Sequence, residues 1–160
     1  MKYVLDTNAV SELMRGNPAM LARLRSAKKA DVAIPEPVLA ELEYGIARLP
    51  ASRRKRLLLD QLATVKAAIG RAPWTDGVST AFGSIKAVLE RRGARLEDLD
   101  IAIAAHAVAA GAILVTDDVG HLSRVDGLGV ENWSRPGAPP SGDGPATAAT
   151  ARRRRGSPSA

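Results

Sequence analysis

The sequence contains no cysteine, only two histidines and few aromatic residues, which make up 3% of its 160 residues. The lack of cysteine excludes a disulfide framework, a thiolate zinc site and a cysteine nucleophile. With only His106 and His121, a histidine-rich metal site is also disfavoured, so any metal ion has to bind to oxygen atoms. Hydrophobic residues still form 46% of the chain, so a core built mainly from Leu, Ile, Val and Ala is expected.

Long hydrophobic runs are absent as well. No uninterrupted apolar run reaches the ~18 residues that a membrane-spanning helix requires. Near the amino terminus, Asp6 interrupts the apolar residues before the hydrophobic segment of a signal peptide could form. We therefore expect a soluble cytoplasmic protein with no membrane partner.

The net charge of +6 is concentrated at one end of the chain. Residues 134–160 contain five arginines and one acid, so they account for +4, and residues 1–133 are only mildly basic. The same end lacks Leu, Ile, Val, Met and aromatic residues, so it cannot bury enough apolar surface to offset the entropy of ordering. We predict a folded domain at 1–133 and a disordered Pro/Gly/Ala/Arg-rich tail at 134–160. The run of four arginines in this tail is either solvated or attracted to nucleic acid.

Within residues 1–133, short apolar runs alternate with segments of helical periodicity. Strands are predicted at 3–5, 31–34, 112–115 and 129–133, and 73–74 is a candidate for a fifth. Helices are predicted at 37–49, 57–69, 78–92 and 101–110, and another begins at Asn17-Pro18. This alternation is typical of an α/β fold, with a central parallel sheet of four or five strands and helices on both faces.

Acidic side chains follow two of the predicted strands. Asp6 comes directly after the strand at 3–5, in the turn-like set Asp6-Thr7-Asn8, and Asp117 and Asp118 come just after the strand at 112–115. Ligands of open α/β sheets bind at the carboxyl ends of the strands. If these two strands are neighbours, we expect the acids to face one crevice.

Further acids lie on predicted helices. Either Asp98 or Asp100 is expected to cap the helix at 101–110, where free amide groups favour a carboxylate. Glu41 and Glu43 flank the apolar stripe of the helix at 37–49 on opposite sides, and helical geometry does not choose between them. Taken singly, each of these acids also fits a helix cap, a turn or a solvated surface.

Converging carboxylates without basic partners stay ionised together only if a cation neutralises them. Oxygen ligands select hard ions, which in a cytoplasm are Mg²⁺ or Mn²⁺. Such a site suits hydrolysis of phosphodiester bonds, because the ion binds phosphate oxygens and activates water. No Gly-rich phosphate loop indicates a nucleotide triphosphatase instead.

Five short motifs, read in order, carry a resemblance to a known family. They are residues 3–13 (YVLDTNAVSEL), 40–46 (AELEYGI), Gly93 followed by 100–107 (DIAIAAHA), 114–118 (LVTDD) and 129–133 (GVENW). Together they resemble the motifs of PIN-domain ribonucleases, in particular VapC toxins of bacterial toxin–antitoxin pairs. The resemblance covers about residues 1–133, and the arginine-containing tail is not part of it.

This resemblance implies an Mg²⁺-dependent endoribonuclease that acts on RNA, forms a homodimer and is blocked by a cognate VapB-like antitoxin. It implies that Asp6, Glu41 rather than Glu43, and Asp100 bind the metal. The fourth acid is Asp118 by the family's spacing, and the adjacent Asp117 is the alternative. Hydrogen bonds from two further residues would support the site. These supporting residues are Asn8 and Thr116.

Two other functional classes remain as alternatives. A phospho-acceptor domain of the receiver type is also α/β with clustered acids, but it needs a lysine at the end of a late strand, and Val115 is followed by Thr116 and acids. A PIN-like RNA-binding or regulatory module without catalysis would keep the fold and lose the acids, which are intact here. We therefore expect an RNA-cleaving enzyme.

Overall fold

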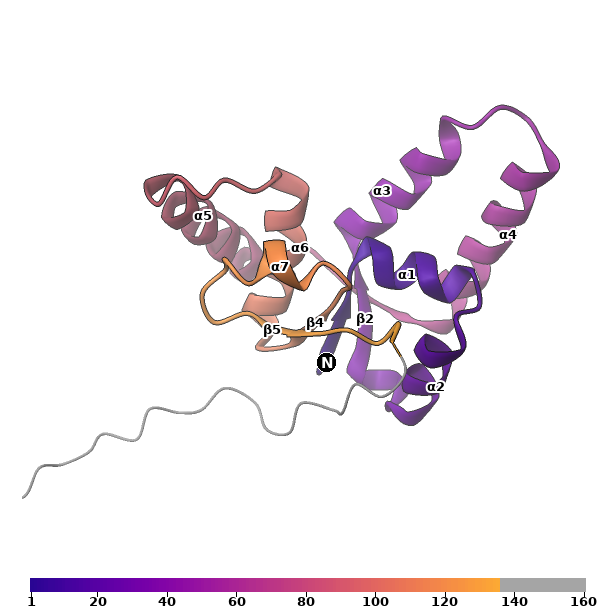
Figure 1. The fold of residues 1–160 in the computed structure, drawn as a ribbon, viewed down its shortest axis with the longest axis horizontal. Helices are drawn as coiled ribbons and strands as arrows, with labels where there is room; N and C mark the ends of the chain where they lie inside the picture. The colour runs from indigo at the N-terminus through magenta and orange to yellow at the C-terminus, as the bar shows by residue number, and fades with distance from the viewer. Residues whose placement is uncertain (136–160) are drawn as a thin grey trace, which may run out of the picture.

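The structure is a computed structural model that describes residues 1–135, so residues 136–160 of the predicted tail lie outside the described part. Figure 1 shows the chain of strands and helices. The strands are β1 (Tyr3–Leu5), β2 (Val32–Pro35), β3 (Gly70–Ala72), β4 (Ile113–Val115) and β5 (Gly129–Glu131). The helices are α1 (Thr7–Met14), α2 (Pro18–Ser26), α3 (Glu36–Ala47), α4 (Arg53–Ala68), α5 (Asp76–Arg91), α6 (Asp98–Ala110) and α7 (Val119–Leu122), with a short 3-10 helix η1 (Lys29–Asp31).

The five strands form one parallel sheet in the order β3-β2-β1-β4-β5, as the alternating pattern predicts. β1 lies in the centre and pairs with β4, with Leu5 opposite Val115. Strands β1 to β3 are added in one direction and β4 and β5 in the other, so the strand order reverses between β1 and β4. Such a reversal is where ligands of open α/β sheets bind.

Helices cover both faces of this sheet. Figure 1 shows α5 and α6 on one side and α1 and α2 on the other, while α3 and α4 form a hairpin that extends beyond the sheet. Helix α6 is buried continuously from Ile101 to Ala107. This agrees with its sequence, which is mostly apolar on all sides of the helix rather than along one stripe.

The turn predicted at Asp6-Thr7-Asn8 is instead the beginning of α1. The Asp6 side chain caps this helix and accepts a hydrogen bond from the backbone N of Ala9 at 2.7 Å. The helix continues because its apolar residues, which include Val10, share one buried face. Residues that favour turns also favour helix caps, so the local sequence did not separate the two outcomes.

Two other local predictions need correction. The residue that precedes α6 is Glu97, and it caps the helix without a side-chain hydrogen bond, so neither Asp98 nor Asp100 is the cap. Both lie in the first turn of α6, where the helix dipole still favours their charge. The third strand ends at Ala72, just before Pro73 and Trp74, because proline has no amide hydrogen to continue the pairing.

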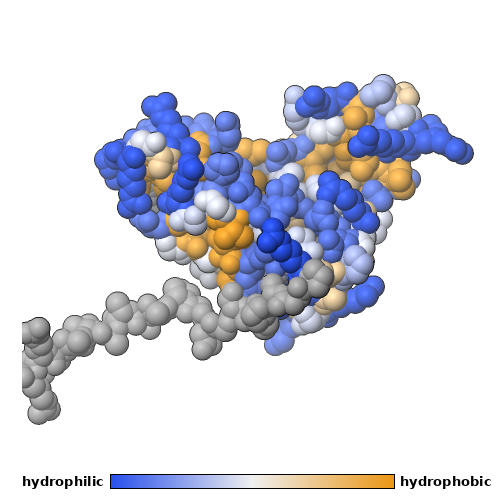
Figure 2. All heavy atoms as spheres, in the orientation of Figure 1, coloured by the Kyte–Doolittle hydropathy of each residue, from blue (hydrophilic) through white to orange (hydrophobic). Residues whose placement is uncertain are grey.

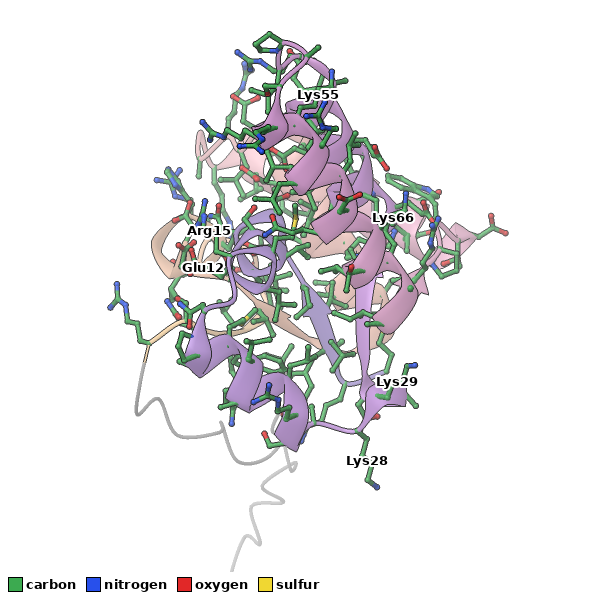
Figure 3. All side chains as sticks on the ribbon, turned by 90° about the vertical axis from the view of Figure 1, so that its right-hand side faces the viewer. Glu12, Arg15, Lys28, Lys29, Lys55 and Lys66 are labelled. Atoms are coloured by element: carbon green, nitrogen blue, oxygen red, sulfur yellow. The ribbon has the colours of Figure 1, made fainter. Side chains whose placement is uncertain are left out.

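Lysines occur at opposite ends of the molecule. Figure 3 shows Lys28 and Lys29 at one end and Lys55, near the start of α4, at the other. Lys28 and Lys29 precede β2 and thus lie at the amino ends of the strands, away from the strand ends that carry the acids. Within residues 1–135, every helix is too short or too polar to cross a membrane.

Candidate active site

The four predicted acids line one pocket of about 110 Å³, although they come from four separate parts of the sequence. Asp6 follows β1, Glu41 lies on α3, Asp100 begins α6 and Asp118 precedes α7. Figure 2 shows that the surface is hollowed between the α3–α4 hairpin and the part formed by α5, α6 and α7. No lysine, arginine or histidine of the described chain lines the pocket. The other lining residues are Thr7, Asn8, Ile103 and Leu122.

Asp6 is the most buried of the four acids, with 7% of its surface exposed. Burial raises the pKa of its carboxyl group to about 6, although hydrogen bonds from the Thr116 side chain and from the Ala9 backbone act in the opposite direction. The charge of Asp117 raises this pKa further. A carboxylate with these surroundings gains from a nearby cation.

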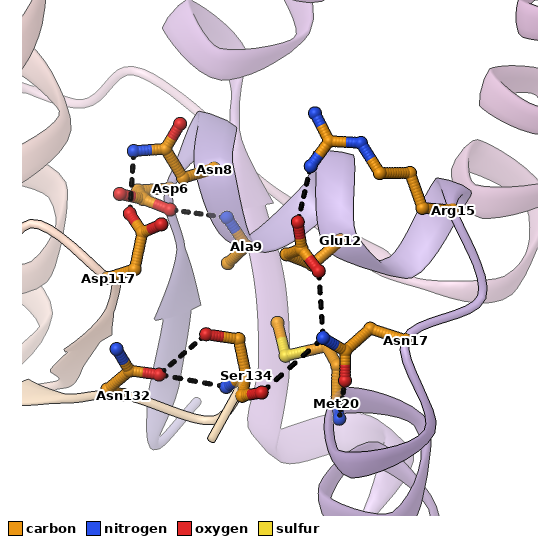
Figure 4. A network of polar contacts seen from close by, with 10 residues as sticks. All are labelled: Asp6, Asn8, Ala9, Glu12, Arg15, Asn17, Met20, Asp117, Asn132 and Ser134. Atoms are coloured by element: carbon orange, nitrogen blue, oxygen red, sulfur yellow. Dashed lines mark hydrogen bonds and ion pairs between the residues drawn. The ribbon is translucent and has the colours of Figure 1, made fainter.

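The two adjacent acids after β4 point to different surroundings. Asp118 lines the acid pocket, whereas Asp117 does not, and its Oδ1 accepts a hydrogen bond from Nδ2 of Asn8 at 2.8 Å (Figure 4). Thr116 links the residues that follow β1 and β4. Its side chain forms a hydrogen bond with Asp6, and its Oγ1 accepts a hydrogen bond from the backbone N of Asp118 at 3.0 Å. The geometry therefore places Asp118 in the pocket and Asp117 beside it.

The two glutamates of α3 are also separated by the structure. Glu41 lines the pocket, and its carboxylate accepts a hydrogen bond from the Thr7 hydroxyl. Glu43 lies outside the pocket and forms an ion pair of 2.8 Å with Lys66 of α4. Thr7 was not among the residues singled out from the sequence, although its place directly after Asp6 at a strand end was the available signal.

Asp100 is half-buried, and its pKa is raised above the usual range. Burial is the main cause, and the negative charges of Glu41, Asp118 and Glu97 add to it, while His121 acts against it. In contrast, His121 lowers the pKa of Asp118, because its Nδ1 lies 3.0 Å from Oδ2 of Asp118. Asp100 is therefore repelled by other acids of the pocket, and within residues 1–135 Asp118 is the pocket acid whose side chain is paired with a histidine.

The donor set fits a hard divalent ion, since four carboxylates surround one pocket whose lining holds no cation. As the side chains stand, no three acidic or histidine side chains of residues 1–135 converge closely enough to hold an ion. Glu41 is bound to Thr7, and Asp118 is bound to His121. An ion at this pocket would therefore need its acidic side chains to move closer together.

His106 is not part of the pocket. It is buried on α6, its Nδ1 lies 2.8 Å from the carbonyl oxygen of Ala102, and its ring packs edge-on against Trp74 with 5.3 Å between the ring centres. His106 is therefore a packed residue of the core that does not reach the acid pocket. Its role is to fill space between α6 and the segment before α5.

Comparison with known proteins places the chain in a family. Residues 3–128 match the family model described as the PIN domain. Ribonuclease VapC2 of Rickettsia felis is 29% identical over 137 residues, which cover 84% of this chain and 100% of the relative. The tRNA(fMet)-specific endonuclease VapC of Shigella flexneri is 30% identical over 137 residues, which cover 84% of this chain and 99% of the relative.

A solved structure agrees with these relatives. The crystal structure of VapBC2 from Rickettsia felis bound to a DNA fragment from their promoter contains a chain that superposes with a TM-score of 0.73 at 28% identity, covering 83% of this chain and 99% of that one. The family model, the full-length relatives and the shared fold agree with the five motifs of the sequence. The chain therefore belongs to the PIN-domain family and, within it, to the VapC toxins.

Proposed function

We propose that this protein is a metal-dependent endoribonuclease that acts in the cytoplasm as the toxin of a type II toxin–antitoxin pair. Mg²⁺ is the proposed ion, and Mn²⁺ is an alternative with the same ligand preference. The observation that carries the proposal is the gathering of Asp6, Glu41, Asp100 and Asp118 around one pocket without a compensating cation. The names of the relatives, which are ribonucleases and a tRNA-specific endonuclease, support the choice of RNA.

In this proposal, each acid has a role that follows from its surroundings. Asp6 is held rigidly by the Ala9 amide and by Thr116, so it would fix the position of the ion. Asp100 and Asp118 would complete the ligand set from α6 and from the end of β4, and Glu41 would bind the ion or orient the attacking water from α3. The bound ion would supply the positive charge that binds phosphate oxygens and activates water for in-line attack.

Asn8, Asp117 and Thr116 would support the site without binding the ion. Asn8 holds Asp117 away from the pocket through the 2.8 Å hydrogen bond. Thr116 joins Asp6 to the backbone of Asp118, so it fixes the separation of these two acids. Such partners of metal ligands orient the carboxylates and tune their basicity.

The partners belong to the same proposal. The relatives include a chain crystallised as VapBC2 on promoter DNA, so we propose a VapB-like antitoxin as the protein partner of this toxin. We also propose a homodimer, which rests on the resemblance of the five motifs to VapC toxins. Co-expression with the product of a small neighbouring gene should give a stable complex that no longer cleaves RNA. Light scattering of the protein alone should give twice the chain mass, and a monomer would contradict the homodimer.

The activity is tested with the purified full chain on total RNA and on single-stranded RNA, in the presence of Mg²⁺, Mn²⁺ or a chelator. Replacing a residue that only orients a metal ligand lowers activity by about 10–100-fold. Asp6 is a proposed ligand itself, so Asp6→Asn should lower the cleavage rate by more than about 100-fold. Asp118→Asn and Glu41→Gln should show comparable losses. The matched control for Glu41, Glu43→Gln, should lose less than about tenfold, because Glu43 lies outside the pocket. Asp117→Asn should show an intermediate loss of about 10–100-fold, because Asp117 supports the site without lining the pocket.

Two results would contradict the proposal. Asp6→Asn that cleaves RNA as fast as the parent would show that the pocket is not the active site. A parent that binds RNA but does not cleave it with either ion would favour the binding module without catalysis.

A further inference from the structure

A second hollow of about 560 Å³ adjoins the acid pocket. Asp100 lines both, and His121 of the second hollow is bound to Asp118 of the first. The two hollows are therefore continuous at the start of α6. The lining of the second is Arg95, Leu96, Glu97, Asp98, Asp100 and His121.

Unlike the acid pocket, the second hollow has side chains of both charges in its lining, with Arg95 beside the acids Glu97, Asp98 and Asp100. Asp98 is neutralised by Lys86, whose Nζ lies 2.6 and 2.9 Å from its two carboxylate oxygens. Arg95 is exposed and forms no hydrogen bond or ion pair with another residue of the part that the structure describes, whereas nearby Arg92 is bound to Asp126 through two hydrogen bonds. Arg95 is thus a free guanidinium at the rim of an acidic site.

A nuclease with an acidic pocket must still attract a polyanion. Four carboxylates repel the phosphates that flank the scissile bond, even when a bound ion offsets part of their charge. A free guanidinium offers paired donors that match phosphate oxygens, and it keeps its charge at every relevant pH. Arg95 meets this need because it lines the hollow that shares Asp100 with the acid pocket.

The remaining lining suits a nucleobase. Single-stranded RNA is bound by combining cations for the backbone with flat or apolar side chains for unstacked bases, and histidine is one of the residues used. His121 is exposed with its ring fixed by Asp118, and Leu96 is half-buried. A volume of about 560 Å³ is in the range of small-ligand sites.

We infer that this second hollow binds the nucleotide next to the scissile phosphate, with Arg95 contacting its phosphate and with His121 and Leu96 contacting its base. The inference rests on the proposed function, because it assigns a substrate-binding role beside the same acids. Arg95 contributes to substrate affinity here and takes no part in the bond-breaking step. His121 is a poor test residue, since it also holds Asp118.

The test compares Arg95→Ala with Arg91→Ala, an exposed arginine at the end of α5 that does not line the hollow. Binding of a fluorescent single-stranded RNA is measured by anisotropy in chelator, where no cleavage occurs, over a series of salt concentrations. Arg95→Ala should weaken binding about tenfold, as expected for loss of hydrogen bonds to a charged group. It should also lower the slope of log affinity against log salt by about 0.7, the value for one phosphate contact on a single strand.

Cleavage assays provide a second readout. Arg95→Ala should raise KM with kcat changed less than about twofold, the pattern of lost ground-state binding. In an RNA that the parent cleaves, an uncharged methylphosphonate at the flanking phosphate should weaken binding to the parent and leave binding to Arg95→Ala unchanged. Arg91→Ala should behave as the parent in every assay.

The two hypotheses fail in different ways. If the parent cleaves RNA and Asp6→Asn does not, but Arg95→Ala equals Arg91→Ala in affinity and salt slope, the binding hollow is overturned and the proposed function stands. If the parent binds RNA through Arg95 but cleaves none, RNA binding by the second hollow is supported and the proposed endoribonuclease activity is contradicted. If the parent neither binds nor cleaves RNA, both are overturned.

Discussion

Two buried carboxylates at the carboxyl ends of their strands have opposite surroundings. Asp6 follows β1 and Glu131 ends β5, with β4 between them, and their exposed fractions are nearly equal at 7% and 6%. Glu131 accepts hydrogen bonds at 2.6 Å from Nη2 of Arg23 and at 2.7 Å from Nε1 of Trp133. Within residues 1–135, Asp6 accepts hydrogen bonds from uncharged groups only, and it lines a pocket together with other acids.

The partners of Glu131 form a structural cluster. The Arg23 guanidinium lies 5.1 Å from the centre of the Trp133 ring, and this ring packs edge-on against Tyr3 with 4.8 Å between the ring centres. The cluster ties the last strand to α2 and to β1, three segments that are far apart in the sequence. Removing one partner of a buried ion pair destabilises the fold, whereas a buried acid that lies in a cleft without a cation is a candidate functional group.

The largest expected effect is the loss of the paired acid. Glu131→Ala leaves Arg23 and Trp133 without their acceptor, and removing one partner of a buried ion pair costs about 3–5 kcal/mol. Because Arg23 keeps 23% of its side chain exposed, the lower end of this range is expected for the free energy of unfolding. Urea denaturation followed by circular dichroism measures this loss.

The matched control is Glu43→Ala, which breaks the exposed ion pair with Lys66 and should cost less than about 1 kcal/mol. Equal losses in the two variants would show that the Glu131 cluster contributes no more than a surface pair.

The next effect has the opposite sign, because Asp6→Asn should stabilise the metal-free protein. The carboxyl group of Asp6 has a pKa of about 6 in the folded chain and 3.8 as the reference for the unfolded chain, so the folded state binds the proton more tightly. Unfolding free energy therefore falls as pH rises from 3.8 to about 6, and the loss is complete above that pH. The difference corresponds to up to about 3 kcal/mol, and asparagine still caps α1.

The measurement is the unfolding free energy of Asp6→Asn and of the parent in chelator between pH 4 and pH 8. The stability gained by the variant should be small at pH 4, grow to about pH 6 and then stay constant. A gain that is already complete at pH 4 would mean that the charge of Asp6 is not its cause.

The smallest of the three expected effects is the stabilisation of the protein by added Mg²⁺, which would supply a cation to Asp6 but not to Glu131. An ion that binds only the folded state at ten times its Kd stabilises it by about 1.4 kcal/mol. Mg²⁺ should therefore raise the unfolding free energy of the parent at pH 7.5 and leave that of Asp6→Asn nearly unchanged, while Glu131→Ala should respond as the parent does. An equal response of the parent and Asp6→Asn would place ion binding elsewhere.

The sequence predicted which acids lie together better than it predicted some of the elements that position them. The positions of Asp6 and Asp118 after apolar strands were sufficient to place them at one edge of the sheet, because parallel strands end at the same edge. Helix α1 was missed because Asp6-Thr7-Asn8 suits a turn as well as a helix cap. Helix α7 was missed because its four residues are too few to show a helical period.

Residue spacing alone does not tell which acid of each neighbouring pair lines the pocket. Glu41 and Glu43 lie on the same helix, and packing places Lys66 of α4 beside Glu43 and Thr7 of α1 beside Glu41. Asp117 and Asp118 are adjacent in the chain, and only the placement of α1 brings Asn8 to Asp117. The resemblance to VapC toxins favoured Glu41 and Asp118, and these are the two that line the pocket.

The sequence by itself determined the α/β class, the central strands and the acids at their carboxyl ends, because these follow from local periodicity and from the chain direction of parallel strands. Tertiary structure alone decided that β1 and β4 are neighbours, that Arg23 neutralises Glu131 while Asp6 has no such partner, and that Arg95 lies free beside the acids. The physical reason is that charge compensation depends on distances of a few ångströms between segments up to 108 residues apart, and only packing sets those distances.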